Sequence, residues 1–214
     1  MASIYDLKPR FQALLRPATR WLAGRGVTAN QVTLAAVMLS LAAGALVAAA
    51  PTSRAVLLSV PVVLFLRMAL NAVDGMLARE HGMKTRLGAV LNELGDVVAD
   101  AGLYLPLALV PGVSAIGVTL VAVLGIISEM AGVVAVQIGA DRRYEGPLGK
   151  SDRAFAFGCV FFLLGCGVEP GRWLNIVWWI LGALSAVTIF NRSRRALEIA
   201  AGPPSGNTDD MRTP

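Results

Sequence analysis

Four carboxylate and amide side chains stand between residues 71 and 100, inside two segments that are otherwise apolar enough to be buried in lipid. They are Asn71, Asp74, Asn92 and Asp96. A carboxylate at the centre of a bilayer costs about 2.5 to 3.5 kcal/mol on insertion scales, so such residues usually face a polar cavity and act there. Oxygen ligands of this kind also suit hard divalent cations. The pattern predicts an active site in the hairpin that these residues form.

Helical spacing puts the four side chains on two surfaces that can meet. At about 100° per residue, Asn71 and Asp74 share one side of a helix, and Asn92 and Asp96 share one side of the next. Counted inward from Arg79 at about 1.5 Å per residue, Asp74 lies roughly 8 Å deep and Asn71 roughly 12 Å deep. Counted in the same way from Arg86, Asn92 lies roughly 9 Å deep and Asp96 roughly 15 Å deep. The two helices therefore present their polar groups at similar depth.

The same stretch resembles the signature of the CDP-alcohol phosphatidyltransferases, D-x2-D-G-x2-A-R-x8-G-x3-D-x3-D, and every gap has the right length. Asn71 and Asn92 stand where the family has its first and third aspartates. The string VTANQVT at residues 27–33 also resembles the family's T-P-N-x-x-T before the first span, although Asn30 could instead cap a helix. The eight matching positions of the signature are Asn71, Asp74, Gly75, Ala78, Arg79, Gly88, Asn92 and Asp96.

The resemblance implies a role for each matching position. In the family, the aspartates bind a divalent metal and the CDP diphosphate, and the last aspartate is the general base. Carried over, Asp74 and Asp96 are metal ligands, and Asp96 is also the catalytic base. Asn71 and Asn92 are weaker ligands through their amide oxygens, and the cofactor is Mg²⁺ or Mn²⁺. The implied nucleotide-binding residues, whose small members let the nucleotide approach the backbone, are Asp74, Gly75, Ala78, Arg79 and Gly88.

The activity that the resemblance implies is a membrane transferase of phospholipid biosynthesis. Such an enzyme moves a phosphatidyl, or substituted phosphoryl, group from a CDP-alcohol, above all CDP-diacylglycerol, to a small alcohol and releases CMP. The acceptor in many relatives is phosphorylated, and a phosphate needs arginine or lysine nearby. Anionic lipid binding and topology are the alternative roles for such basic residues. The acceptor-phosphate candidates are Arg142, Arg143, Lys150, Arg153, Arg192 and Arg195.

The two motif asparagines keep a second hypothesis open. In that hypothesis, the chain is a catalytically weakened or inactive relative, or a transporter-like membrane protein. The intact spacing favours the transferase, because a pump or channel more typically spreads its acids over several helices or broken spans. Further implied partners are the lipid bilayer and, by family resemblance, a second copy of the chain; a nucleic acid is not expected.

The composition indicates one polytopic membrane domain. The 214 residues are 56% hydrophobic and 15% charged, and the mean hydropathy is +0.64. We expect an all-α integral membrane protein with an N-terminal interfacial helix, residues 1–24, a six-helix transmembrane domain, residues 25–200, and a disordered tail, residues 201–214. The six expected spans are approximately residues 32–50, 55–78, 87–110, 113–140, 154–168 and 173–190.

The N-terminal segment alternates apolar and basic residues at helical spacing, which is typical of an amphipathic helix lying in the membrane interface. Pro9 and Pro17 predict that this helix is broken into short pieces. The alternative for the segment is a basic anchor without catalytic duty.

Lysine and arginine are strongly biased to one side of the expected topology. Both termini and the second and fourth loops are rich in them, whereas Arg54 and Arg172 are the basic residues on the other side. The positive-inside rule therefore puts both termini and the mouth of the motif on the cytoplasmic side of the inner membrane. The fourth loop, residues 141–153, is expected at that mouth.

Arg67, Asp100 and Glu129 are charged residues that lie within the expected spans and outside the motif. Arg67 and Asp100 lie roughly 18 and 21 Å deep by helical rise, so we expect them to form an ion pair, with Asp96 as the second choice of partner for Arg67. Glu129 either lines the cavity or pairs with a neighbouring helix.

Overall fold

The computed structural model describes residues 4–201, with side chains from Arg10 onward, and this part of the chain is helical without strands. The expected tail at 201–214 lies outside the described residues except for Ala201. The elements are α1 (Ile4–Gly24), α2 (Ala29–Ala49), α3 (Arg54–Glu80), α4 (Arg86–Tyr104), the 3₁₀ helix η1 (Leu105–Leu109), α5 (Ala115–Gln137), α6 (Lys150–Gly165) and α7 (Arg172–Ala200).

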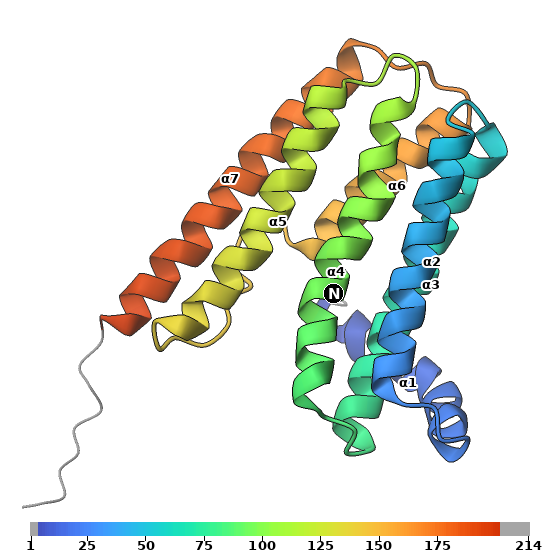
Figure 1. Cartoon of the computed structure of the whole chain (residues 1–214). Coiled ribbons are helices and arrows are strands. Elements are labelled where there is room, and N and C mark those ends of the chain that lie inside the picture. The colour runs from blue at the N-terminus through green and yellow to red at the C-terminus, as the bar shows by residue number, and fades with distance from the viewer. Residues whose placement is uncertain (1–3, 202–214) are drawn as a thin grey trace, which may run out of the picture.

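From α2 to α7 the chain reverses direction at every connection (Figure 1). The start of α2, the α3–α4 and α5–α6 connections and the end of α7 lie towards one end of the bundle, the lower end in Figure 1. The loop after α5 climbs from that end into the middle of the molecule, where α6 begins. Helix α2 packs against α3 and α4, α3 packs against α6, and α5 packs along α7.

Four of the described helices, α2, α3, α5 and α7, are long and apolar enough to cross a membrane. The prediction of an all-helical chain is therefore confirmed for the described residues, and the four helices are consistent with an integral membrane protein. Six spans stay a prediction. Helix α4 falls short because Glu93, Asp96 and Asp100 lie within its 19 residues, and α6 falls short because it has only 16 residues.

Two helix boundaries differ from the prediction. The third span was expected to run to residue 110, but α4 ends at Tyr104 and the chain tightens into η1, where Pro106 has no N–H for an α-helical bond. The fourth loop was expected to run to Arg153, but α6 begins at Lys150. The backbone N–H of Gly149 donates to Oδ2 of Asp152 at 2.8 Å and fixes this start. Lys150 and Arg153 are thus held on a helix.

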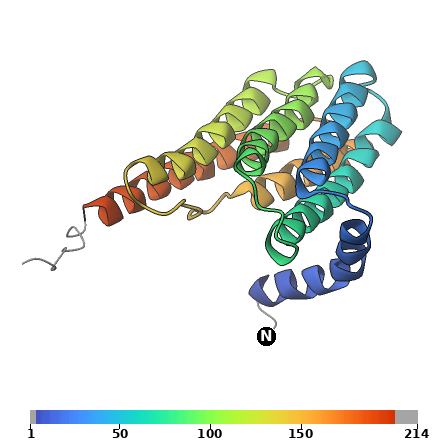
Figure 2. The same cartoon turned by 60° about the horizontal axis from the view of Figure 1, so that its bottom comes forward.

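Helix α1 is continuous from Ile4 to Gly24, so the prediction of short broken pieces is wrong. Pro17 removes one intrahelical hydrogen bond without ending the helix, and the ribbon of α1 turns along its course (Figure 2). The helix packs on α3, where Arg16 pairs with Glu80 at 3.0 Å. This exposed hydrogen bond raises the pKa of the Arg16 guanidinium.

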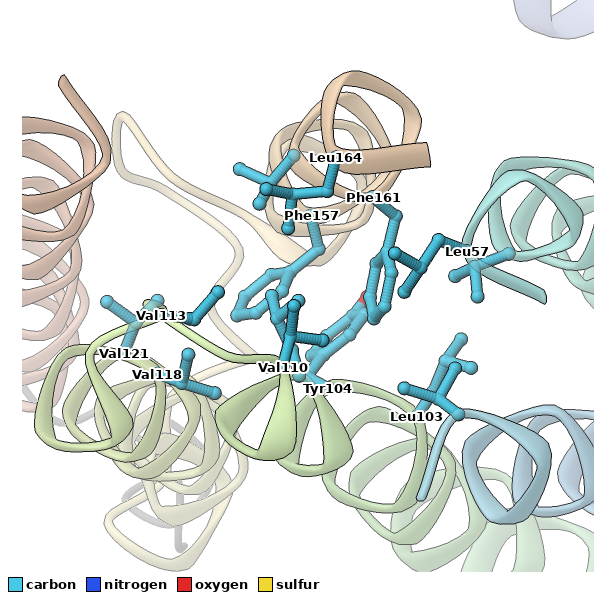
Figure 3. Packing of buried hydrophobic residues seen from close by; sticks show 14 of the residues in the cluster. Leu57, Leu103, Tyr104, Val110, Val113, Val118, Val121, Phe157, Phe161 and Leu164 are labelled. Carbon is cyan, nitrogen blue, oxygen red and sulfur yellow. The ribbon is translucent and has the colours of Figure 1, made fainter. Parts of the chain in front are cut away.

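The main apolar core joins α2, α3, α4, η1, α5, α6 and α7, and Figure 3 shows part of it from close by. Tyr104 and Phe157 stack with ring centroids 4.0 Å apart, and Phe157 also contacts Trp178 with centroids 5.6 Å apart. On another face of α4, a Cβ atom built on Gly44 of α2 would collide with the carbonyl oxygen of Gly102. These contacts fix α4 relative to its neighbours and so fix the side chains of the motif.

Candidate active site

The motif side chains of α3 and α4 meet, as the helical spacing predicts. Nδ2 of Asn71 donates to Oδ1 of Asp96 at 3.4 Å. Asp74 is buried, with 5% of its surface exposed, and its Oδ2 accepts a hydrogen bond from the Thr33 hydroxyl at 2.8 Å. Asn92 is half-buried on α4, one turn before Asp96. Asn71 and Asp96 therefore join the two motif helices directly, while Asp74 is held by α2 and Asn92 lies on α4 one turn from Asp96.

A third helix, α2, contributes to this site through Thr33. Sequence reasoning singled out the string that contains Thr33 without giving that residue a role. The N-terminus of α2 is capped by Thr28, whose hydroxyl accepts from the N–H of Gln31 at 3.3 Å, so the alternative that Asn30 caps the helix is wrong. Nδ2 of Asn30 instead donates to the hydroxyl of Thr85 at 3.4 Å. The string thus ties α2 to both motif helices.

The small motif residues lie where helices and side chains approach closely. A Cβ atom on Gly88 would come within 2.6 Å of Oδ1 of Asn30, so the absence of a side chain at Gly88 leaves room for the Asn30 side chain between α2 and α4. A Cβ atom on Gly75 would lie 3.0 Å from the guanidinium of Arg79, which folds back over it. Ala78 is half-buried on the same helix. Nucleotide binding by these residues stays a prediction.

Deeper along the same contact, Arg67 of α3 lies between two acids of α4. Its NH1 atom is 2.5 Å from Oδ1 of Asp100, which is the pair that helical rise predicts. Its NH2 atom donates to the backbone carbonyl of Asp96 at 3.2 Å and lies 3.6 Å from the Asp96 carboxylate. Lys150, the first residue of α6, forms an ion pair with the same Asp96 carboxylate.

Glu129 of α5 is the centre of a second group of buried charges. It pairs with Arg153 of α6 at 2.9 Å, with Arg142 at 3.3 Å and with Arg192 of α7 at 3.5 Å. Arg153 also lies 3.6 Å from Asp100, which connects this group to the motif helix α4. Of the two roles left open for Glu129, pairing with neighbouring helices is the one that the structure shows.

The six acceptor-phosphate candidates divide into four settings. Arg142, Arg153 and Arg192 gather around Glu129, as described above. Arg143 pairs with Glu145 at 2.6 Å in the loop before α6; burial alone would raise the pKa of Glu145, but its hydrogen bonds and Arg143 lower it. Arg195 is exposed and pairs with Glu198 at 3.1 Å. Lys150 lines a cavity that is large enough to hold a ligand.

This cavity, of about 650 Å³, lies between α3 and α6. One part of it is polar and includes residues of the motif and its ion pairs, and the rest is apolar. The polar lining residues are Arg67, Asn71, Asp100, Lys150 and Ser151, and the other lining residues are Pro61, Leu64, Phe65, Met68, Ala154, Phe155, Gly158, Cys159, Phe162 and Leu163. The arrangement suits a ligand with a polar, charged head and a long apolar part.

Comparison with known proteins decides the family. Residues 26–190 match the CDP-alcohol phosphatidyltransferase family. The chain belongs to this family. Inner membrane protein YnbA of Escherichia coli (strain K12) is 46% identical over 199 residues, which are 93% of this chain and 98% of that protein. The resemblance read from the motif residues is therefore confirmed.

Solved structures of Mycobacterium tuberculosis phosphatidylinositol phosphate synthase (PgsA1) share the fold. The structure with CDP-DAG bound superposes with a TM-score of 0.71 and 22% identity, covering 92% of this chain and 98% of that one. The complex with manganese and citrate gives a TM-score of 0.68 and 23% identity, with 92% of each chain covered. At this identity the likeness concerns the fold.

The donor set of this phosphatidyltransferase-family chain differs from the family pattern in its charge. Within residues 4–201, no three or more of His, Cys, Asp and Glu come together as a metal-binding group. Two carboxylates and two amide oxygens nevertheless suit one hard divalent cation, which accepts both kinds of oxygen. The residues present therefore fit one such cation, with half of the acidic charge that the family pattern carries.

Proposed function

We propose that this chain is an enzyme that transfers a phosphatidyl, or substituted phosphoryl, group from a CDP-alcohol to a small alcohol and releases CMP, in phospholipid biosynthesis. CDP-diacylglycerol is the donor that we favour. The observation that carries this proposal is the cavity between α3 and α6, in which Asn71 and Lys150 line the polar part beside a long apolar part. A donor with a diphosphate head and acyl chains has the same division. PgsA1, which shares the fold, has been solved with CDP-DAG bound.

The chemistry that we propose is a single phosphoryl transfer. The acceptor hydroxyl oxygen forms a bond to the phosphorus on the lipid side of the diphosphate, and the bond from that phosphorus to the CMP oxygen breaks. The hydroxyl proton passes to the Asp96 carboxylate, and CMP leaves with the bonding electron pair. Asn71 and Arg67 hold Asp96 in place through the 3.4 Å and 3.2 Å hydrogen bonds described above.

Mg²⁺ or Mn²⁺ is the cofactor that we propose. When bound, such a cation neutralises charge that develops on the diphosphate oxygens. Asp74 with the amide oxygens of Asn71 and Asn92 would hold it, and Asp96 would be shared between the cation and the acceptor. The donor set fits this role, and PgsA1 has been solved with manganese. Gly75, Ala78, Arg79 and Gly88 are proposed to contact the nucleotide.

For the acceptor we propose a small alcohol without a phosphate group. Arg142, Arg153 and Arg192 each already pair with an acid: all three with Glu129, Arg142 also with Glu93, and Arg153 also with Asp100. A phosphorylated acceptor would have to draw these arginines away from a carboxylate that is 8% exposed, which leaves that carboxylate buried without a partner. An uncharged alcohol avoids this cost.

We further propose six membrane spans, α2 to α7, with α1 as an amphipathic helix in the interface. The arginine-rich connections and the C-terminal part of α7 lie at one end of the bundle, which supports a cytoplasmic location for both termini and for the mouth of the site. The name of the relative YnbA supports the inner membrane. A homodimer is proposed on family resemblance alone.

The test is CMP release from CDP-diacylglycerol by the purified chain with Mg²⁺ or Mn²⁺ and a panel of alcohols. Each alcohol is tested beside its phosphate monoester, for example glycerol beside glycerol 3-phosphate. We expect release that depends on an unphosphorylated alcohol. Release only with a phosphorylated acceptor would overturn the acceptor proposal and leave the transferase intact. No release with any acceptor would favour the second hypothesis, an inactive or transporter-like relative.

A further inference from the structure

Lys150 has a setting that neither the fold nor the family pattern explains. It is the first residue of α6, its side chain is 29% exposed, and it lines the polar part of the cavity. Its ammonium pairs with Oδ1 of Asp96. Nδ2 of Asn71 and NH2 of Arg67 lie 3.4 and 3.6 Å from the same oxygen. Three nitrogen atoms, two of them cationic, therefore surround a carboxylate oxygen that would otherwise be open to a metal ion.

The charge of the site makes this setting significant. Four aspartates at the motif positions would carry four negative charges, enough to compensate two divalent cations. This chain has two, Asp74 and Asp96, and Lys150 adds one positive charge beside Asp96. A second divalent cation at Asp96 would stand within a few ångströms of the ammonium, where the mutual repulsion is strong. The two amides each remove a negative charge and the lysine adds a positive one, so all three make the site less negative.

We infer that the ammonium of Lys150 takes the place of a second divalent cation in this chain. In the apo state it pairs with Asp96, and with substrate bound it neutralises a phosphoryl oxygen of the CDP-alcohol as a point charge. The site therefore takes one divalent cation per chain. This inference rests on the proposed function, because it assigns Lys150 to the diphosphate of that donor.

Among the cations that line the cavity, Lys150 is the one suited to this role. Arg67 is 4% exposed and held by Asp100 at 2.5 Å and by the backbone of Asp96. Lys150 has an ion pair with Asp96 alone among the described residues, and a flexible four-carbon stem lets its ammonium turn from that carboxylate to a phosphate. Its backbone is fixed by the start of α6, so the charge stays close to the site.

The first test counts bound Mn²⁺ by electron paramagnetic resonance on the full chain in detergent, with cytidine 5′-diphosphate as the diphosphate probe. Wild type is expected to bind one Mn²⁺ per chain. Asn71→Asp with Asn92→Asp, keeping Lys150, should still bind one. Adding Lys150→Met to that pair should give two. Lys84 is an exposed lysine of the α3–α4 connection, and adding Lys84→Met to the pair instead should leave the count at one Mn²⁺ per chain.

Three outcomes of this count would overturn the inference. The first is zero or two Mn²⁺ bound to wild type. The second is two Mn²⁺ bound to Asn71→Asp with Asn92→Asp, and the third is one Mn²⁺ bound to that pair combined with Lys150→Met. If Lys150→Met fails to fold, the Mn²⁺ counts of wild type and of Asn71→Asp with Asn92→Asp still test the inference. Two bound Mn²⁺ in either protein would show that Lys150 does not exclude a second cation.

The second test measures the affinity for cytidine 5′-diphosphate in EDTA, where only the charges of the chain act. Lys150→Met should weaken binding about tenfold, as expected for one charge-assisted contact. Lys150→Arg should restore most of the affinity, and Lys84→Met should have no effect. A purely structural ion pair would lower the melting temperature and leave this affinity unchanged, which would refute the inference. Neither binding test needs turnover, so a failure of CMP release would count against the proposed function separately.

Discussion

Oε1 of Glu129 on α5 lies 2.9 Å from NH2 of Arg153 on α6, and neither side chain is more than 10% exposed. Arg192 of α7 lies 3.5 Å from the same oxygen, so one carboxylate joins three helices. Arg153 continues to Asp100 of α4 at 3.6 Å. A change at Glu129 therefore reaches the motif helix through a buried chain of charges.

We expect Glu129→Gln to destabilise the fold strongly. The substitution keeps the shape of the side chain but leaves Arg142, Arg153 and Arg192 close together without their shared counter-charge. Breaking a buried ion pair on one side costs on the order of 3 to 5 kcal/mol. Thermal unfolding in detergent measures the loss, with Glu198→Gln as the control, because Glu198 pairs with arginine at the exposed end of α7. Equal melting temperatures for the two variants would refute a structural role for Glu129.

The close approach of α2 and α4 gives a second stability prediction. Gly44→Ala should be destabilising, because the added Cβ would meet the carbonyl of Gly102 and force the helices apart. Overpacking of this kind costs about 1 to 3 kcal/mol. Gly24→Ala is the matched control, since nothing lies within 4 Å of a Cβ built there. Urea or thermal unfolding of both variants in the same detergent decides the matter, and an unaffected Gly44→Ala variant would contradict the proposed contact.

Local spacing predicted the parts of the site that depend on one or two neighbouring helices. Asn71 and Asp96 meet because both lie on the inner faces of a hairpin, and Arg67 meets Asp100 because helical rise sets both depths. The spans of α2, α3, α5 and α7 followed from runs of apolar residues. These features need no knowledge of how distant segments pack.

The remaining features depend on distant segments or on backbone detail. Thr33 reaches Asp74 because α2 packs against α3, which periodicity does not encode. The partners of Glu129 come from three separate parts of the chain. The polar residues and glycines before Lys150 predict a loop that includes it, but the Asp152 side chain accepts from the Gly149 N–H and starts the helix one turn earlier. The ion pair of Lys150 with Asp96 could not be predicted from that loop assignment.

The general base can be tested by Asp96→Asn. We expect CMP release to fall by roughly 10² to 10⁴-fold, the usual contribution of a positioned acid or base, while the protein elutes as a folded species. Asp141→Asn, on the exposed loop after α5, should keep wild-type turnover and serves as the control. If Asp96→Asn turned over at a near-normal rate with CDP-diacylglycerol and the true acceptor, the base would be another group, and Asp100 would be examined next.

The two free cysteines allow the lipid part of the proposed donor to be located. Both are exposed on α6 or its end, but Cys159 lines the cavity and Cys166 does not. Because a ligand that fills the cavity covers Cys159, CDP-diacylglycerol at ten times its dissociation constant should slow alkylation of that thiol by a maleimide about tenfold. Alkylation of Cys166 should be unchanged, and mass spectrometry of the peptides reports both rates in one sample. Protection of both thiols would indicate a general effect of the lipid on the micelle, and unprotected Cys159 would mean that the acyl chains lie elsewhere.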